Sequence, residues 1–423
     1  MHPKALLDSC SELMRQVLLF DHPADAVVAR FFRQHRQLGP RERHTLSETV
    51  YAVLRQKLLF DHFAPWGSGP RERRMAILGF QADGDFLRSA LSEAEKAWLD
   101  RCQAIRQDDL LERHRHNLPD WLAQALKDQV GGEFWALVES LHEPAPLDIR
   151  INTIQAKRHE VISALKQAGI ESTPTPYSPW GLRLRGKAQL GRVPSFVQGG
   201  FEVQDEGSQL LALLTEARRT EMVVDFCAGA GGKTLALGAS MRNTGRLYAF
   251  DTSAARLDAF KSRLGRSGLS NVHPAVIAHE RDDRVRRLRG KIDRVLVDAP
   301  CTGLGTLRRH PDLKWRQNEQ TVAEMAAAQA SILRAAARLL KPGGRLVYAT
   351  CSLLVQENEA IARAFSQESS DFVSVPALEV LQGLKVEQAQ TMCVGGDNGD
   401  QYLRLWPHRH QTDGFFAAVW QRR

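Results

Sequence analysis

Residues 222–234 read MVVDFCAGAGGKT, an apolar run that leads directly into a loop of small residues. The apolar run predicts a buried β-strand, and the residues after the loop are typical of a helix. Glycine and alanine let a backbone turn sharply and approach a ligand closely, while the following helix offers unpaired N–H groups. We therefore expect a strand, a ligand-binding loop and a helix in succession. The candidate binding residues are Cys227, Ala228, Gly229, Ala230, Gly231, Gly232 and Lys233.

Similar apolar runs recur towards the C-terminus at 245–251 (GRLYAFD), 292–300 (IDRVLVDAP) and 344–350 (GRLVYAT), with helical patterns between them. Strands that alternate with helices predict a parallel sheet covered on both faces. Ligands of such sheets bind at the carboxyl ends of the strands. We expect the α/β fold class, with a Rossmann-like catalytic domain over residues 201–423.

The first half of the chain carries different patterns. Residues 1–140 repeat apolar positions at helical intervals, which predicts an all-helical domain. Its basic residues Arg41, Arg43 and Arg55 form either a solvated face or a candidate RNA-binding surface. Pro40 opens one of its helices, because proline fits the first turn. From 141 to 200, alternating stretches such as 147–154 (LDIRINTI) predict a small α+β domain that binds RNA or links the other two.

The composition is that of a globular protein, with 43% hydrophobic and 25% charged residues in a chain of 423. A net charge of +8 is compatible with a nucleic-acid partner without requiring one. The six cysteines form no CxxC or Cys/His cluster, so we expect no metal site and a reducing compartment. Because no apolar run of about 18 residues occurs, we expect a cytoplasmic protein, with monomer as the default state.

The second apolar run ends at Asp251, whose carboxylate can accept hydrogen bonds from both ribose hydroxyls of a nucleoside cofactor. S-adenosylmethionine and NAD both fit this requirement. The glycine loop ends in Gly-Lys-Thr as a P-loop does, but P-loop spacing requires glycine where Cys227 stands. A triphosphate-binding loop is therefore disfavoured.

Two cysteines follow predicted strands, Cys301 in the segment DAPCTGLG and Cys351 in the segment TCS. Methylation of C5 of cytosine needs such a set of groups. A thiolate adds at C6, a carboxylate such as Asp298 binds or protonates N3, and a second thiol, or water that it positions, removes the C5 proton. The alternative is that both thiols are small core side chains. That is the role we expect for Cys10, Cys102 and Cys393.

Five segments together resemble the signature motifs of the RNA 5-methylcytosine methyltransferases of the NOL1/NOP2/Sun (RsmB/NOP2/Sun) family. They are VQDEGSQL (203–210), CAGAGGKT (227–234), DAPCTGLG (298–305), ATCSLLVQENE (349–359) and TDGFFAA (412–418). The segments LGPRERHTLSETVYAVLR and RINT are similar to the bacterial branch that acts on small-subunit ribosomal RNA. The resemblance implies S-adenosylmethionine as cofactor and RNA as substrate.

The resemblance also implies roles for single residues. Cys351 is the nucleophile and Cys301 the residue needed for product release, while Asp298 and Lys233 contact the target base. The loop 227–233, Asp251 and Asp298 bind the cofactor. Residues 276–284 (VIAHERDDR) depart from the family pattern near the adenine, so none of the polar residues there is assigned to it. The unassigned candidates are His279, Glu280 and Asp282.

Two basic clusters are candidates for RNA contact. The cluster at 281–291 is equally compatible with a solvated helix face. For the second cluster we expect RNA contact, because it follows the cysteine segment and mixes cations with aromatic side chains. Its members are Arg308, Arg309, His310, Lys314, Trp315 and Arg316. The target base must be unstacked to reach a thiol, which favours single-stranded or loop RNA.

Other functions remain open from the sequence. A cytosine-C5 methyltransferase acting on DNA would use Cys301 as nucleophile and would not need Cys351; transfer RNA is another possible substrate. A non-catalytic RNA-binding assembly factor would bind the cofactor without turnover. A nicotinamide-dependent oxidoreductase gives the two cysteines no role.

Overall fold

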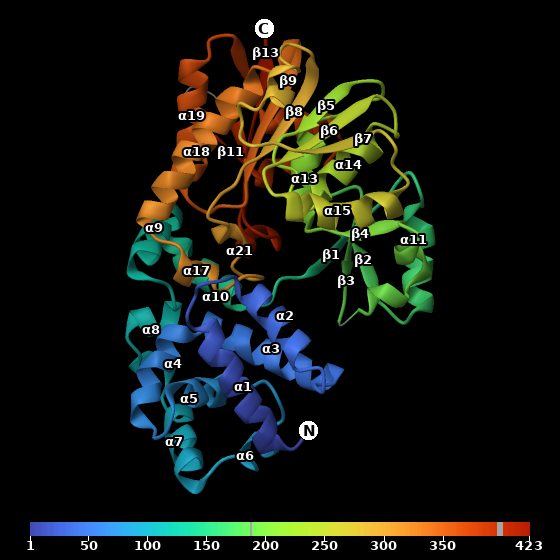
Figure 1. The fold of residues 1–423 in the computed structure, drawn as a ribbon. Coiled ribbons are helices and arrows are strands. Elements are labelled where there is room, and N and C mark those ends of the chain that lie inside the picture. The colour runs from blue at the N-terminus through green and yellow to red at the C-terminus, as the bar shows by residue number, and fades with distance from the viewer. Residues whose placement is uncertain (187, 396–400) are drawn as a thin grey trace. The chain divides into compact units, whose positions relative to one another are not determined.

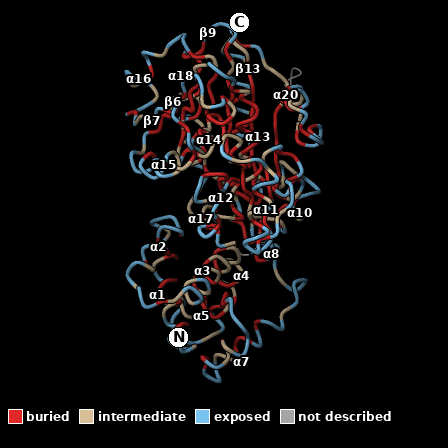
Figure 2. The backbone as a smooth tube through the Cα atoms, turned by 90° about the vertical axis from the view of Figure 1, so that its right-hand side faces the viewer, coloured by how far each residue is buried: buried red, intermediate tan, exposed pale blue. Residues whose placement is uncertain are grey.

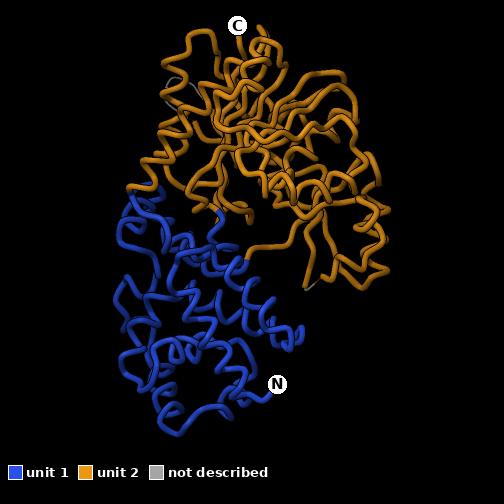
Figure 3. The backbone as a smooth tube through the Cα atoms, viewed as in Figure 1, with its two compact units in different colours: residues 1–144, 306–319 blue, residues 145–305, 320–423 orange. Residues whose placement is uncertain are grey.

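The computed structural model describes residues 1–186, 188–395 and 401–423. The chain divides into two compact units (Figure 3). The first contains residues 1–144 and 306–319, and the second contains residues 145–305 and 320–423. Among the described residues, no helix is long and apolar enough to cross a membrane.

The first unit is helical, as the sequence predicts. In α1 (Pro3–Val17) and α3 (Pro40–Arg55) the periodic apolar side chains are buried, and α3 begins at the expected proline. Its other helices are α2 (Ala24–Gln34), α4 (Lys57–Phe63), α5 (Arg71–Leu78), α6 (Gly84–Arg88), α7 (Glu93–Gln103), α8 (Glu112–His116), α9 (Asp120–Val130) and α10 (Phe134–His142).

Residues 306–319, which contain α17 (Leu313–Arg316), return to this helical unit after the cysteine loop. The Trp315 indole N–H donates to the Leu54 carbonyl at 2.7 Å and packs against the helical core. The Lys314 ammonium donates to the Arg55 carbonyl at 2.8 Å. Arg308 is also buried and donates to the Pro144 carbonyl at 2.8 Å. The predicted RNA contact is therefore wrong for Arg308 and Lys314, because these buried side chains bind backbone carbonyls of their own unit. For the partly buried Trp315, RNA contact stays a prediction.

The second unit opens with a small antiparallel sheet in the order β2-β3-β1-β4. Its strands are β1 (Leu147–Ile151), β2 (Ser172–Pro174), β3 (Gly181–Leu184) and β4 (Phe201–Val203), and α11 (Arg158–Gln167) and α12 (Pro194–Val197) accompany them. Glu202 of β4 binds both Arg263 and Arg266 of α15 (Ala254–Ser267) at 2.9 and 2.6 Å. A buried carboxylate thus joins the small sheet to helix α15.

A larger, nine-stranded sheet forms the centre of the second unit among the described residues. Figure 2 shows buried backbone concentrated along its strands. The order β11-β12-β13-β9-β8-β5-β6-β7 has parallel pairing from β9 to β7, as predicted. The parallel strands are β5 (Met222–Asp225), β6 (Arg246–Asp251), β7 (Val272–Val276), β8 (Ile292–Asp298) and β9 (Leu340–Thr350).

The remaining strands are antiparallel, which the sequence patterns did not reveal. They are β10 (Phe372–Val375), β11 (Cys393–Gly395), β12 (Gln401–Leu405) and β13 (Phe415–Arg422). Strand β13 runs beside β9, with Phe416 opposite Thr350. The segment TDGFFAA therefore enters the sheet next to β9, the strand that Cys351 directly follows.

Helices cover both faces of the large sheet (Figure 1). One apolar cluster includes residues of α13 (Glu206–Leu214), α14 (Gly232–Ser240) and α20 (Ala377–Gly383). The other includes residues of α18 (Glu319–Ala337) and α19 (Glu359–Glu368). The two further helices are α16 (Asp283–Arg286) and α21 (Pro407–His410). This is the doubly covered α/β architecture expected from the strand–helix alternation.

Candidate active site

The two cysteines of interest lie together at the carboxyl edge of the sheet. Cys301 follows β8, Cys351 follows β9, and the two strands are neighbours. Their Sγ atoms are 3.3 Å apart, although the residues are separated by 50 positions in the chain. Both side chains are only partly buried. The structure thus brings two thiols into direct contact in a place that a ligand can reach.

Gly305 fastens the Cys301 loop to the Cys351 segment. Its N–H donates to the Cys351 carbonyl at 2.8 Å, and its own carbonyl accepts from the Gly414 N–H at 2.8 Å. A Cβ atom at position 305 would lie 2.1 Å from the Gly414 carbonyl oxygen. Gly305 is the last residue of the motif DAPCTGLG, and the sequence alone does not indicate its role. Its role is steric, because three separate segments approach within backbone contact there.

Lys233 and Asp298 form an ion pair in the same region, with Nζ and Oδ2 2.7 Å apart. Burial lowers the pKa of Lys233, but the charge and hydrogen bond of Asp298, with a smaller contribution from the charge of Cys351, hold this pKa above its usual value. The ammonium also lies 5.8 Å from the centre of the Phe415 ring. Lys233 is therefore a fixed cation next to the thiol pair.

The surroundings of Cys301 disfavour ionisation of its thiol. The hydrogen bond with Cys351, burial, and the negative charges of Cys351 and Glu357 all raise the pKa of Cys301 well above its usual value. The raised pKa favours the protonated form of the Cys301 thiol, and either sulfur can be the donor in the contact between the two.

The glycine loop has the geometry of a ligand cradle. Gly231 starts α14 at φ +80°, and a Cβ atom there would lie 2.0 Å from the Phe260 ring. Gly229, at φ +54°, has open space where its Cβ would stand. The Gly229 N–H donates to Asp251 Oδ2 at 2.8 Å, and the Ser253 N–H donates to Oδ1 at 2.7 Å. An exposed backbone beside a fixed carboxylate fits an adenosyl group.

Asp225, the last residue of β5, adds a buried acid to this region. One of its oxygens accepts from the Thr234 hydroxyl at 2.6 Å, and the other has no hydrogen-bond partner among the described residues. Burial raises the pKa of Asp225 to about 7. Burial also raises the pKa of the nearby Cys227 thiol, so this cysteine is not an activated nucleophile.

The polar residues expected near the adenine have partners of their own. Asp282 caps α16 by accepting from Arg284 N–H, and it also accepts from Ala278 N–H. Glu280 accepts from the Ser331 hydroxyl at 2.7 Å, and His279 Nδ1 accepts from the Arg281 N–H at 3.1 Å. These bonds give no reason to prefer one residue for the adenine.

The basic cluster at 281–291 lies at the surface, where all six cations are exposed. Arg286 pairs with Asp283 within α16, and Arg284 donates to the Val276 carbonyl. The exposure is compatible with both the solvated face and the RNA contact.

Among the described residues, no group of three or more histidine, cysteine, aspartate or glutamate side chains could hold a metal ion.

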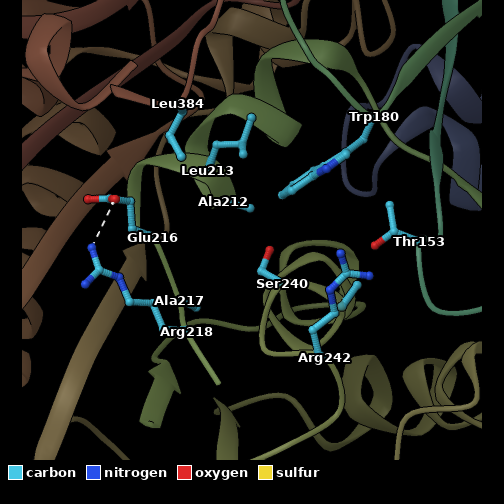
Figure 4. A pocket seen from close by; sticks show the side chains of 11 residues that line it. Thr153, Trp180, Ala212, Leu213, Glu216, Ala217, Arg218, Ser240, Arg242 and Leu384 are labelled. Carbon is cyan, nitrogen blue, oxygen red and sulfur yellow. Dashed lines mark hydrogen bonds and ion pairs between the residues drawn. The ribbon is translucent and has the colours of Figure 1, made fainter. Parts of the chain in front are cut away.

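A cavity of about 310 Å³ lies away from the cysteines (Figure 4). Trp180, Glu216, Arg218, Ser240 and Arg242 are among the residues that line it. The chain from Glu216 to Arg218 precedes β5, and Ser240 ends α14, so the cavity belongs to the amino edge of the sheet. It contains none of the predicted site residues.

Known proteins resemble both the sequence and the fold. A family model described as 16S rRNA methyltransferase RsmB/F matches residues 212–421, and one described as an RsmF/B-like ferredoxin-like domain matches residues 118–190. The probable ribosomal RNA small subunit methyltransferase B of Synechocystis sp. is 31% identical, over 96% of this chain and 97% of that protein. These matches confirm the family resemblance expected from the motifs.

Solved structures agree with the fold. The crystal structure of PH0851 gives a TM-score of 0.80 at 27% identity and covers 100% of this chain and 99% of its own. A methyltransferase homolog protein from Pyrococcus horikoshii gives a TM-score of 0.64 at 25% identity, over 75% of this chain and 100% of its own. The α/β methyltransferase fold class is therefore confirmed.

Proposed function

Because the chain belongs to the RsmB/NOP2/Sun family of RNA methyltransferases, we propose that it forms 5-methylcytosine in small-subunit ribosomal RNA through a covalent bond between Cys351 and C6. S-adenosyl-L-methionine supplies the methyl group as a sulfonium. The loop 227–233 and Asp251 would hold this cofactor, since they combine exposed backbone with a fixed carboxylate.

One observation carries the proposal: the Cys301 and Cys351 sulfurs are 3.3 Å apart beside the Lys233–Asp298 pair. Two neighbouring thiols suit a reaction that needs a nucleophile on C6 and, later, a group that helps to remove the C5 proton of the same base. Two core cysteines would need neither partial exposure nor a neighbouring cation.

Each residue then has a distinct chemical role. The Cys351 thiolate adds to C6 of cytosine, which makes C5 nucleophilic. Asp298 and Lys233 bind the polar edge of the base, and a proton held between them and N3 favours the addition. After methyl transfer, the C5 proton passes to water that Cys301 positions, or to the Cys301 sulfur once that thiol has released its own proton to water. The electron pair of the C5–H bond restores the ring double bond and expels Cys351.

The test compares wild type, Cys351→Ala and Cys301→Ala on unmethylated ribosomal RNA with S-adenosylmethionine. Methyl incorporation and RNA–protein adducts on a denaturing gel are both measured. We expect Cys351→Ala to give neither methylation nor adduct, and Cys301→Ala to accumulate adduct. Cys393→Ala serves as the control, because that cysteine lies in β11 outside the thiol pair.

The same experiment separates the alternatives. If Cys301→Ala is inactive without adduct while Cys351→Ala still methylates, the nucleophile is Cys301, as in cytosine-C5 methylation of DNA. If wild type binds the cofactor but methylates neither ribosomal nor transfer RNA, the chain is a non-catalytic RNA-binding factor.

A further inference from the structure

The residue after each of the two cysteines carries a hydroxyl group, and both hydroxyls bind the same carboxylate. The Thr302 hydroxyl donates to Glu357 Oε2 at 2.5 Å. The Ser352 hydroxyl donates to the same oxygen. The two hydroxyl oxygens are themselves 3.4 Å apart. A single oxygen atom therefore joins the two loops one residue away from each thiol.

The other carboxylate oxygen completes the attachment. Glu357 Oε1 accepts from the Thr302 N–H at 2.8 Å and from the Gln329 side-chain amide at 3.0 Å. Gln329 also donates to the Pro300 carbonyl at 2.9 Å, on the other side of Cys301. Glu357 is fully buried, and these neighbours are uncharged donors. The carboxylate is thus solvated by groups of the two cysteine loops and α18 in place of water.

The backbone of Glu357 is held as well. The Tyr348 hydroxyl lies 2.5 Å from the Glu357 carbonyl oxygen and 3.1 Å from Gln329 Oε1. Tyr348 belongs to β9 and Gln329 to α18, so both the strand before Cys351 and the covering helix brace the carboxylate.

We propose that Glu357 is the positioning residue that sets the separation of the Cys301 and Cys351 thiols, by binding both cysteine loops through its buried carboxylate. The importance of this separation for catalysis rests on the two-thiol function proposed above. A buried carboxylate that loses its donors is left without solvation, so the loops cannot move apart without a large penalty. The anion also disfavours a second negative charge on Cys301.

The proposal predicts how substitutions act. Glu357→Gln keeps the shape but loses the charge, and its NH2 group cannot accept from the hydroxyls. Glu357→Ala leaves both hydroxyls and the Thr302 N–H without their acceptor. Ser352→Ala and Thr302→Val each remove one hydroxyl donor, and Thr302→Val keeps the bond from the Thr302 N–H to Glu357. We expect the affinity for the cofactor to stay unchanged in all these variants. None of the four hydrogen bonds that the Glu357 carboxylate accepts involves the glycine loop.

The first measurement needs no catalysis. Diamide oxidises two neighbouring thiols to a disulfide and takes up their two hydrogens, so the rate of Cys301–Cys351 cross-linking reports the thiol separation. The full-length chain is treated, quenched with an alkylating agent, digested and mapped by mass spectrometry. We expect Glu357→Gln and Glu357→Ala to cross-link about tenfold more slowly than wild type, equivalent to about 1.4 kcal/mol.

Glu206→Gln is the matched control. Glu206 is equally buried, and its carboxylate accepts from the Tyr177 and Ser178 N–H groups at 2.6 and 2.7 Å, away from the cysteine loops. Its cross-linking rate should equal that of wild type. If Glu357→Ala does not fold, as judged by thermal melting, then Glu357→Gln, Ser352→Ala and Thr302→Val carry the test.

A second measurement addresses catalysis. In the Cys301→Ala background, adduct formation with ribosomal RNA should be slower in Glu357→Gln by about tenfold, with the KM for S-adenosylmethionine unchanged. Cross-linking at the wild-type rate in the folded Glu357 variants overturns the inference, whatever the RNA assay gives. Slower cross-linking with no adduct in Cys301→Ala itself supports Glu357 as the positioning residue and rejects the proposed function.

Discussion

The Gly305 N–H donates to the carbonyl oxygen of Cys351 at 2.8 Å, so the loop that carries one thiol rests on the backbone of the other. The contact requires glycine, because a Cβ atom would lie 2.7 Å from that carbonyl oxygen and 2.1 Å from the Gly414 carbonyl oxygen. Backbone atoms on both sides leave no flexible group that could give way.

We therefore expect Gly305→Ala to separate the two thiols and to reduce kcat for RNA methylation at least about tenfold, equivalent to about 1.4 kcal/mol in the barrier. Cofactor affinity, measured by calorimetry, should not change. Gly265→Ala is the control, since that helical glycine has open space and an ordinary φ. It should keep full activity and gain about 0.5–1 kcal/mol of stability. Wild-type kcat in Gly305→Ala would contradict the steric role.

Lys233 supports the next prediction, because it is the cation beside both Asp298 and the thiol pair. Lys233→Met keeps the length of the side chain but leaves Asp298 without its cation and removes a positive charge near Cys351. Single-turnover methylation should fall by about 10²–10⁴-fold, the range for loss of a proton-transfer partner.

Lys261→Met provides the comparison for this substitution. Lys261 is exposed and pairs with Asp258 on its own helix, so its loss should leave single-turnover methylation unchanged. An equal fall in both lysine variants would show that general loss of positive charge, and weaker RNA binding, explains the effect.

The cofactor loop and the parallel strands were predictable because their signals are local. An apolar run, a small-residue loop and a helix occupy 222–240 in succession, and each local preference agrees with the fold. The shared edge then follows from parallel topology, so the meeting of Cys301 and Cys351 could be expected before their distance was known.

What could not be predicted depends on contacts between distant segments. The return of residues 306–319 to the helical unit rests on bonds such as Trp315 to Leu54, which no periodicity signals. Basic residues of this segment, such as Arg308 and Lys314, resembled an RNA-binding surface because their burial against distant segments has no local sequence signal. The role of Glu357 was also hidden, since its sequence motif gives no sign that Thr302 is its partner.

Asp225 leads to a prediction about pH. Its pKa in the folded chain is about 7, raised by burial from 3.8. A folded-state pKa above the unfolded value stabilises the fold at low pH, where the group is protonated in both states, and this stability is lost as pH rises through 7.

Asp225→Asn removes this dependence while keeping an acceptor for the Thr234 hydroxyl. The difference in melting temperature between Asp225→Asn and wild type should therefore increase in favour of the variant from about pH 4 to about pH 7, and then stay constant. Thermal melting in a buffer series at constant ionic strength measures it. A difference that does not change with pH would mean that folding does not raise the pKa of Asp225.

Arg263 connects the small sheet to the cofactor loop. Its Nη1 donates to the Ala230 carbonyl at 2.7 Å, and its Nε donates to Glu202 of β4 at 2.9 Å. Arg266 binds the same glutamate but stacks on Phe196, and no hydrogen bond joins it to the loop among the described residues. The two arginines therefore form a matched pair that separates a role in cofactor binding from a role in joining the two sheets.

Arg263→Ala should weaken S-adenosylmethionine binding by about tenfold, because a charge-assisted hydrogen bond is worth about 1.5–3 kcal/mol and water replaces part of it. Arg266→Ala should lower the melting temperature about as much as Arg263→Ala does. It should leave the Kd for S-adenosylmethionine unchanged. Isothermal titration calorimetry on the purified full-length variants measures the affinity. Equal losses of affinity in the two variants would mean that joining the sheets, and not the bond to Ala230, shapes the cofactor loop.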